Sequence, residues 1–385
     1  MKNTTRLSPP DGSSSASSSN SAPKKRHKNR KKRILIGCLI AVGVLVIGVA
    51  IAAYAIKEHM LNQIQYVTDP ESPTMINESG ETVKIADLTT ETQEEAGASD
   101  KIHNILLLGV DSRDDSYSDD GTGSRADIIM ILTVDENNNI LKLTSIQRDC
   151  YVKIPGYSKL QKVNAAMNFG GPELLITVLE SYLRIDLEEY AYVNFAHMAN
   201  IIDDVGGVWV NVSNSEKSFM PGQTETGDVL LDGEMAVTYA RLRHLGNGDY
   251  DRSLRQVEVL QSLLNSFMKM NLIQQTNTLS DILSEVVTNI PKGQIEKYAF
   301  DILPRLTSSQ IDYLQIPIDG YYNEGMYSDV RDNEWSIRCN WNGMIPLIQE
   351  FIFGKTFAFD PVDTIAGAPT TTPTPTAAET TKAAA

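Results

Sequence analysis

The sequence predicts an α/β protein: an α/β/α domain with a central mixed sheet flanked by helices, behind a single N-terminal transmembrane helix. Short apolar runs typical of buried strands alternate with stretches of helical periodicity, which favours a sheet covered by helices. The chain has 385 residues, of which 42% are hydrophobic and 22% are charged. This composition is that of a globular protein and excludes a wholly disordered or fibrous chain. One long uncharged apolar segment near the N-terminus predicts the transmembrane helix.

That apolar segment is Ile34–Ile56, which contains no charged residue. At ~1.5 Å per residue it forms a helix of about 35 Å, longer than the ~30 Å hydrocarbon core of a bilayer. Basic residues at 24–33 precede it, and such blocks stay cytoplasmic and contact anionic membrane lipid. We therefore expect a single-pass protein of the cell membrane with residues 57–385 outside. A cleaved signal peptide is the alternative, but it would have a shorter apolar core.

The charge of the chain is divided unevenly. The formal net charge is −15, yet residues 1–33 contain ten Lys or Arg and one Asp, a charge of +9. The part that follows the apolar segment therefore carries −24, the difference between these two values. We expect no nucleic-acid partner, because the sequence-independent part of nucleic-acid affinity comes from Lys and Arg. Three cysteines are too few for a disulfide scaffold, and no His/Cys cluster suggests zinc.

Five regions follow along the chain. Residues 1–33 are Ser-rich and basic, and we expect a disordered cytoplasmic tail. The transmembrane helix at 34–56 leads to an acidic, partly ordered extracellular stalk at 57–100. The folded, catalytic domain is predicted at 101–360. The remainder, 361–385, is rich in Thr, Pro and Ala and reads as a disordered tail.

Three strands open the predicted domain. Residues 104–110 and 128–134 are short apolar runs, 135–139 has turn chemistry, and 140–146 alternates like a third strand. If the first two strands are antiparallel in one sheet, the third returns to the edge where the second began. Polar residues would then meet on that edge, which is where α/β proteins keep their sites. The residues are Asp111, Arg113, Arg125, Asp127 and Arg148.

Helices and strands then alternate to the end of the domain. Pro172 favours the start of a helix that runs through Leu174 to Tyr182. Gly206-Gly207 separates a strand–helix pair from the next strand, and Leu254 to Phe267 marks a long amphipathic helix. The further expected elements are a strand at 190–195, a helix at 196–204, a strand at 208–212, a helix from about 232 to 241, helices near 280–305 and at 341–353, and a strand at 311–316.

The residue types on the predicted edge fit one ligand class. Asp111 and Asp127 could hold a hard cation such as Mg²⁺, which takes one or two carboxylates plus phosphate oxygens. Arginine presents a planar fork that matches phosphate oxygens. Together they suggest a pyrophosphate bound with Mg²⁺. A network of surface salt bridges, each worth about 0–1 kcal/mol, explains the same residues equally well.

A second basic cluster favours the pyrophosphate interpretation. Arg252 and Gln256 are four residues apart and share a helix face, with Arg255 beside Arg252. Arg241 and Arg243 point the same way if the chain is extended past the end of the preceding helix. Four arginines fall within 15 consecutive residues, in a part of the chain that is acidic as a whole. We do not expect such a cluster to serve only as solvated charge.

These segments resemble successive motifs of the LytR–CpsA–Psr family. The resemblance runs in order over about 100–260, behind an anchor of the topology that the family has. The motifs are NILLLGVDSR (104–113), SRADIIMILTV (124–134), SIQRDCYVKIPG (145–156), KVNAAMNFGGPELLITVLE (162–180), YVNFAHMANIIDDVGGVWVNV (192–212), LDGEMAVTYARLRH (231–244) and GDYDRSLRQVEVL (248–260).

The resemblance implies a transferase whose long hydrophobic groove holds a polyprenyl chain. Such enzymes move a glycopolymer, of the teichoic acid or capsular polysaccharide type, from a polyprenyl-pyrophosphate carrier to a muramic acid hydroxyl of peptidoglycan. The resemblance further implies Mg²⁺ or Mn²⁺ as cofactor. The metal would lie on Asp111 and Asp127, with Asp111 the candidate base. Catalysis and pyrophosphate binding would involve Arg148, Arg241 and Arg243, with Arg252, Gln256, Arg113 and Arg255 also binding the pyrophosphate.

Three other functions compete with the transferase. An envelope-linked transcriptional attenuator would need a DNA-binding fold, for which residues 1–33 are too short. A non-catalytic wall-binding protein and a polyprenyl-pyrophosphate pyrophosphatase also remain open. The chain departs from the family at Gln147, Cys150 and Val257, where Pro, Thr or Ser, and Gln are usual. Whether Cys150 pairs with Cys339 is also open.

Overall fold

The computed structural model describes residues 62, 65–66, 73–88, 101–110, 123–243, 245–246, 248–302, 305, 311–327 and 334–370. The predicted cytoplasmic tail and the predicted transmembrane segment at 34–56 lie outside these residues, as do Asp111 and Arg113. None of the helices in the described ranges combines the length and the apolar character that crossing a bilayer requires.

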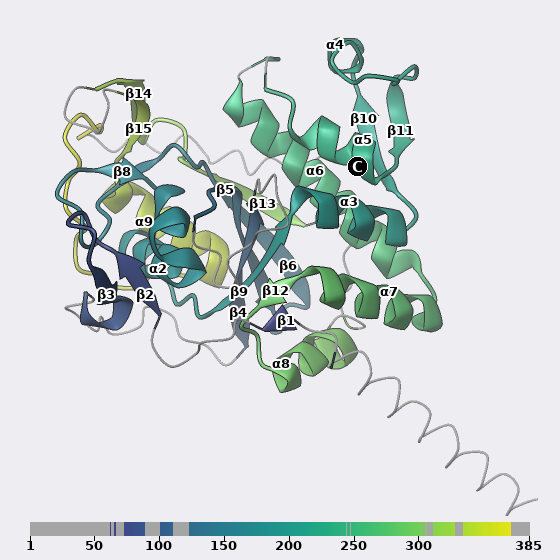
Figure 1. The fold of residues 1–385 in the computed structure, drawn as a ribbon, viewed down its shortest axis with the longest axis horizontal. Coiled ribbons are helices and arrows are strands. Elements are labelled where there is room, and N and C mark those ends of the chain that lie inside the picture. Colours follow the sequence, from purple (N-terminus) through teal and green to yellow (C-terminus); the bar gives the residue numbers. More distant parts are fainter. Residues whose placement is uncertain are drawn as a thin grey trace, which may run out of the picture. The chain divides into compact units, whose positions relative to one another are not determined.

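The centre of the fold is a seven-stranded mixed sheet (Figure 1). Strands β4, β5 and β6 are antiparallel neighbours, whereas β9 runs parallel to β4 and β13 runs parallel to β6. The predicted mixed sheet and the predicted antiparallel order of the first three strands are confirmed. The strand order is β1 (Gln65–Tyr66), β12 (Val287–Thr288), β9 (Glu189–Asn194), β4 (Ile102–Val110), β5 (Ala126–Asp135), β6 (Ile140–Ile146) and β13 (Asp312–Ile316).

Helices cover both faces of this sheet, because side chains of alternate parity along β4 and β5 enter two separate apolar cores. Leu106 and Ile131 pack with α2 (Ala165–Leu183) and α9 (Trp341–Phe353), and Ile105 and Met130 pack with the opposite layer. Figure 1 shows α2 and α9 on one side of the sheet and the other helices across from them. That second layer comprises α6 (Asp249–Lys269), α7 (Leu272–Glu285), α8 (Lys292–Glu296) and the π-helix η2 (Lys297–Ile302).

A third apolar core lies beside the sheet. It is formed by α3 (Phe195–Asp204), α5 (Gly233–Ala240) and the two-stranded sheet of β10 (Val208–Val212) and β11 (Gly227–Leu231), packed against α6. Asp232 caps α5 by accepting a hydrogen bond from the backbone N–H of Met235, which explains why the helix begins where the sequence predicts.

Short elements complete the fold, and three of them, β2, β3 and η1, lie outside the predicted domain limits of 101–360. The hairpin of β2 (Thr74–Ile76) and β3 (Thr82–Lys84) packs on α2 through Met75, which is buried. Ile365 is buried as well, so the folded part extends beyond both limits. The remaining elements are η1 (Ile85–Asp87), β7 (Tyr151–Val152), β8 (Gln161–Lys162), α4 (Asn214–Lys217), β14 (Tyr322–Met326) and β15 (Trp335–Cys339).

The two cysteines whose pairing the sequence leaves open lie next to each other. Cys150 and Cys339 are both buried as free thiols, with their Sγ atoms 3.7 Å apart. A parallel bridge between Cys150 and Ile337 brings the segment after β6 against β15. The contact therefore attaches the loop that carries Arg148 to the β14–β15 hairpin.

Candidate functional site

The strand register brings Asp127 and Arg148 together. Strands β5 and β6 pair Met130 with Ser145, and continuing three residues along each chain places Asp127 opposite Arg148. The Nη1 atom of Arg148 forms an ion pair with Oδ1 of Asp127. The edge predicted from the order of the strands therefore exists, and two of its charged residues are in contact.

A second carboxylate holds Arg148 from the other side. Arg148 Nε donates to Oδ2 of Asp149 at 3.3 Å, and the ammonium of Lys162 lies 2.7 Å from Asp149 Oδ1. Asp149 is 4% exposed. Burial raises the pKa of Asp149, but the hydrogen bond from Lys162 and the charges of Arg148 and Lys162 outweigh it and lower the pKa. The guanidinium of Arg148 is thus held between the carboxylates of Asp127 and Asp149.

This pairing predicts how stability depends on pH. Since the folded-state pKa of Asp149 lies below its unfolded value of about 3.9, the carboxylate contributes stability above about pH 4 and loses it as pH falls through the folded-state pKa. The free energy of unfolding, measured from pH 7 to pH 2 for the wild type and Asp149→Asn, should differ by a constant amount down to about pH 4. In Lys162→Met the folded-state pKa of Asp149 should lie closer to its unfolded value, so the loss on acidification should be smaller. If the difference in unfolding free energy between the wild type and Asp149→Asn already shrank above pH 5, the result would contradict this account.

Two further arginines reach the same end of the sheet. Arg243 Nη2 lies 3.9 Å from Asp127 Oδ1, and the Arg243 side chain is 40% exposed. The guanidinium of Arg241 lies 4.7 Å from the ring centre of Phe195, the residue after β9. Arg241 keeps helical backbone angles at the C-terminus of α5, so the chain is not yet extended there. The condition for a shared direction, an extended chain from Arg241 onward, is therefore not met at Arg241, and the two arginines contact different residues, Phe195 and Asp127.

The first turns of α6 fasten the segment that carries these arginines. Arg255 donates to the carbonyl of Leu242 at 2.7 Å, and its Nη1 lies 3.2 Å from Glu216 Oε1. The Gln256 amide donates to the carbonyl of Ala240 at 3.4 Å. Arg252, one turn before Gln256, is 4% exposed. Arg255 and Gln256 thereby position residues 240–243.

The predicted metal pair is described only in part. Asp127 is half-buried, and its Oδ1 faces two arginines. Asp111 follows β4 in the sequence but is not among the described residues. Within the described ranges, no three His, Cys, Asp or Glu side chains group closely enough to hold a metal ion by themselves.

Apolar side chains between the sheet and α6 are only half-buried. Leu107 of β4 and Leu132 of β5 are partly exposed, although Leu106 and Ile131 on the opposite face are fully buried. Residues in the middle of a helix-covered sheet are ordinarily buried. We call the following partly buried residues of this layer the apolar strip: Leu107, Ile128, Leu132, Leu260 and Leu264.

Sequence reasoning missed several partners of the arginines. Phe195 and Glu216 carry no sequence signal, since each is a single residue far along the chain from the arginine it contacts. Lys162, which pairs with Asp149, is likewise an isolated lysine in the sequence. Asp149 could have been found, because an acid directly after a functional arginine is a natural counter-charge.

Comparison with known proteins identifies the family of the chain. The model of the LytR_cpsA_psr family matches residues 71–337. A protein of Bacillus anthracis named polyisoprenyl-teichoic acid–peptidoglycan teichoic acid transferase TagU is 31% identical over 294 residues, which cover 76% of this chain and 89% of that protein. A TagU of Enterococcus faecalis is 32% identical over 235 residues, 60% of this chain and 75% of the relative.

The fold has known counterparts as well. The crystal structure of Bacillus subtilis TagV superposes with a TM-score of 0.53 at 26% identity, over 66% of this chain and 98% of TagV. The family match covers more than half of the chain, and it includes the segments that hold Asp127, Arg148 and Arg243. The chain therefore belongs to the LytR–CpsA–Psr family.

Proposed function

We propose that the protein transfers a glycopolymer, of the teichoic acid or capsular polysaccharide type, from a polyprenyl-pyrophosphate carrier to peptidoglycan. The observation that carries this proposal is the convergence of Arg148 and Arg243 on Asp127 at one end of the sheet. The face of this sheet that packs against α6 bears the apolar strip. The names of the relatives support it, since those proteins are called teichoic acid transferases acting on a polyisoprenyl-linked polymer and peptidoglycan.

In the proposed reaction the arginines bind the pyrophosphate. Arg148 and Arg243 exchange their contacts with Asp127 for phosphate oxygens, which the guanidinium fork matches. A muramic acid hydroxyl attacks the phosphorus that bears the polymer, its proton passes to a base, and the bond to the bridging oxygen breaks. Polyprenyl phosphate leaves, and the arginines stabilise the charge that builds up on it. Asp111 remains our candidate for the base.

We propose Mg²⁺ or Mn²⁺ as the cofactor. Hard cations of this kind take one or two carboxylates and complete their shell with phosphate oxygens and water. A single carboxylate, Asp127, beside a pyrophosphate site fits that donor set without a cage of protein ligands. Asp127 and Asp111 would hold the ion, which when bound supplies further neutralisation of pyrophosphate charge.

The apolar strip is the proposed seat of the polyprenyl chain. Its side chains expose hydrocarbon between the sheet and α6, and covering that surface with a lipid is favourable by about 25 cal/mol per Å². The strip reaches the binding end of the sheet, because Ile128 is adjacent to Asp127 along β5. A lipid lying there would place its pyrophosphate at the arginines.

A polar substitution in the apolar strip should weaken binding of the long lipid. In Leu264→Asn, affinity for a long-chain polyprenyl pyrophosphate should fall about tenfold, because a buried leucine contact is lost, while affinity for a water-soluble short-chain analogue stays unchanged. Leu347→Asn, at a 37% exposed position on α9, is the matched control. Equal loss for both chain lengths would indicate general damage and remove Leu264 from the lipid path.

We further propose that residues 34–56 anchor the protein in the cell membrane, with the N-terminus cytoplasmic and the catalytic domain outside. Carrier-linked polymer and peptidoglycan would then meet the domain on the same side. The supporting observations are the uncharged run and the basic block before it.

The test of the function is a transfer assay with the full-length protein in detergent. Carrier-linked teichoic acid polymer, peptidoglycan and Mg²⁺ should give polymer bound to peptidoglycan together with free polyprenyl phosphate. Consumption of the carrier at an unchanged rate without peptidoglycan would indicate a pyrophosphatase instead.

A further inference from the structure

A cleft opens next to the loop that carries Arg148. Its volume is about 630 Å³. One wall contains Gln147, the neighbour of Arg148, and another contains Gly248 and Tyr250 at the start of α6. The β14–β15 hairpin closes the far side with Trp335. The cleft therefore adjoins the arginine-bearing elements without including any of the arginines.

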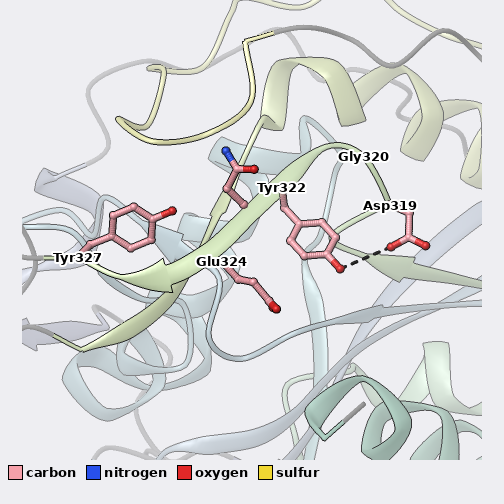
Figure 2. Close-up of a pocket in the computed structure, with 6 residues that line it drawn as sticks. Asp319, Gly320, Tyr322, Glu324 and Tyr327 are labelled. Carbon is pink, nitrogen blue, oxygen red and sulfur yellow. Dashed lines mark hydrogen bonds between the residues drawn. The ribbon is translucent and has the colours of Figure 1, made fainter. Parts of the chain in front are cut away.

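A second hollow of about 680 Å³ continues the cleft along the hairpin. The two share Asp319, Tyr322 and Glu324 as lining residues. Figure 2 shows the Tyr322 hydroxyl directed at the Asp319 carboxylate, to which it donates a hydrogen bond at 3.5 Å. The combined surface suits an extended ligand, because it runs along the whole of β14, from Asp319 before the strand to Tyr327 after it.

The Gln147 side chain brings an amide to the wall of the cleft. The side chain of Gln147 is nine-tenths buried and lines the cleft, yet within the described ranges its amide forms no side-chain hydrogen bond. Its backbone is fixed, because its N–H donates to the carbonyl of Ile316 at 2.8 Å. An amide that is open to the cleft can pair with the hydroxyl or amide groups of a ligand.

The lining favours a sugar. Tyr250, Tyr322 and Trp335 offer aromatic faces for the C–H surfaces of a pyranose ring, and Trp335 is 36% exposed. The carboxylates of Asp319 and Glu324 accept hydrogen bonds from hydroxyl and amide groups. Burial, followed by the neighbouring acids, raises the pKa of both Tyr250 and Tyr322, so both phenols stay protonated and can donate.

The charge of the described lining disfavours the donor polymer. No lysine or arginine is among the described residues that line the cleft, whereas Asp319 and Glu324 both face it. A polyanionic, phosphate-rich chain is repelled by such a surface and attracted by the arginines next to it. An uncharged glycan meets no such repulsion. The two neighbouring surfaces thus separate two substrates of different charge.

We propose that this cleft binds the acceptor, the uncharged amino-sugar strand of peptidoglycan, and presents its hydroxyl to the phosphorus held at Arg148. The inference rests on the proposed function and identifies where that reaction's second substrate lies. Gln147 connects the two subsites, because it lines the cleft and precedes Arg148 in the same loop. Trp335 and Tyr322 provide the stacking surface, and Asp319 and Glu324 select against anionic chains.

The probe for this inference is a peptide-free glycan fragment of peptidoglycan whose muramic acid carboxyls are capped as neutral amides, titrated into the full-length protein in detergent. Trp335→Ala should weaken binding of the fragment about tenfold, because a stacking face is removed. Trp209→Ala removes another exposed tryptophan, 56% exposed on β10, and should change nothing. Glu324→Gln, which alters an exposed acid on β14, should weaken binding without affecting the fold. In transfer assays the KM for peptidoglycan should rise in Trp335→Ala, while affinity for the carrier-linked donor stays at the wild-type value.

The outcomes separate this inference from the proposed function. Suppose that the wild type transfers polymer and that Trp335→Ala and Glu324→Gln bind the fragment as the wild type does. This result would overturn the assignment of the cleft to the acceptor but leave the proposed function intact. Binding that requires the stem peptide would also overturn it, because the peptide and not the sugar would be recognised. Wild-type protein that binds no donor and transfers no polymer would instead reject the proposed function.

Discussion

Replacing Arg148 with alanine is expected to lower the rate of transfer by about 10²–10³, or about 3–4 kcal/mol of transition-state stabilisation. The loss follows from removing a charged, forked donor that lies at the end of the sheet between Asp127 and Asp149. Folding should survive, because Lys162 still pairs with Asp149, and the free energy of unfolding should fall by only about 1–3 kcal/mol. Single-turnover rates and chemical unfolding of the same preparation measure both quantities.

Two variants control this result. Arg148→Lys keeps the charge but not the fork, and it should recover little of the rate. Arg305→Ala removes an exposed arginine and should leave rate and stability unchanged. If Arg148→Ala transferred polymer at the wild-type rate while losing stability, Arg148 would be only a structural ion-pair partner, and the pyrophosphate assignment would lose its main support.

The largest effect on stability is expected at Arg255. Its side chain is 7% exposed and pairs with Glu216, which is 13% exposed. Arg255→Met leaves that half-buried carboxylate without its cation, with only the hydrogen bonds from Ser213 remaining, which costs about 3 kcal/mol of unfolding free energy. The Leu242 carbonyl loses its donor too, so residues 241–243 should shift and the KM for the donor should rise. Thermal unfolding and donor titration measure the two consequences.

A double substitution distinguishes positioning from direct catalysis. Arg255→Met combined with Glu216→Met removes both charges and should recover part of the stability lost in Arg255→Met alone. Lys269→Met, an exposed cation at the other end of α6, is the matched control. An Arg255→Met protein that is as stable as the wild type but has lost most of its kcat would show that Arg255 acts on the phosphate itself.

The first three strands of the sheet could be predicted from the sequence, and with them the core of the site. Two apolar runs and an Asn-rich turn leave one antiparallel order for β5 and β6, and that order alone places Asp127 opposite Arg148. The positions of β9 beside β4 and of β13 beside β6 could not be predicted. Parallel neighbours are chosen by the packing of the crossover helices, and the strand patterns do not encode that choice.

Burial and long-range partners explain most of what the sequence left open. Arg255 is visible as a basic residue, but its partner Glu216 is 39 residues away on another element. The cleft was not predicted, because β14 has no alternating apolar pattern, β15 alternates over only five residues, and the lining comes from four separate segments. Asp111 and Arg113 remain predictions, since they lie outside the described residues.

Following the phosphorus tests the central claim most directly. A carrier-linked polymer would be prepared with an isotopic label on the phosphate next to the sugar, and incubated with the full-length protein, Mg²⁺ and peptidoglycan. The account predicts that the label becomes bound to peptidoglycan in a phosphodiester, that unlabelled polyprenyl phosphate is released, and that Arg148→Ala slows both together. Label that appears as free polymer phosphate, at a rate independent of peptidoglycan, would contradict a transferase and identify a hydrolase.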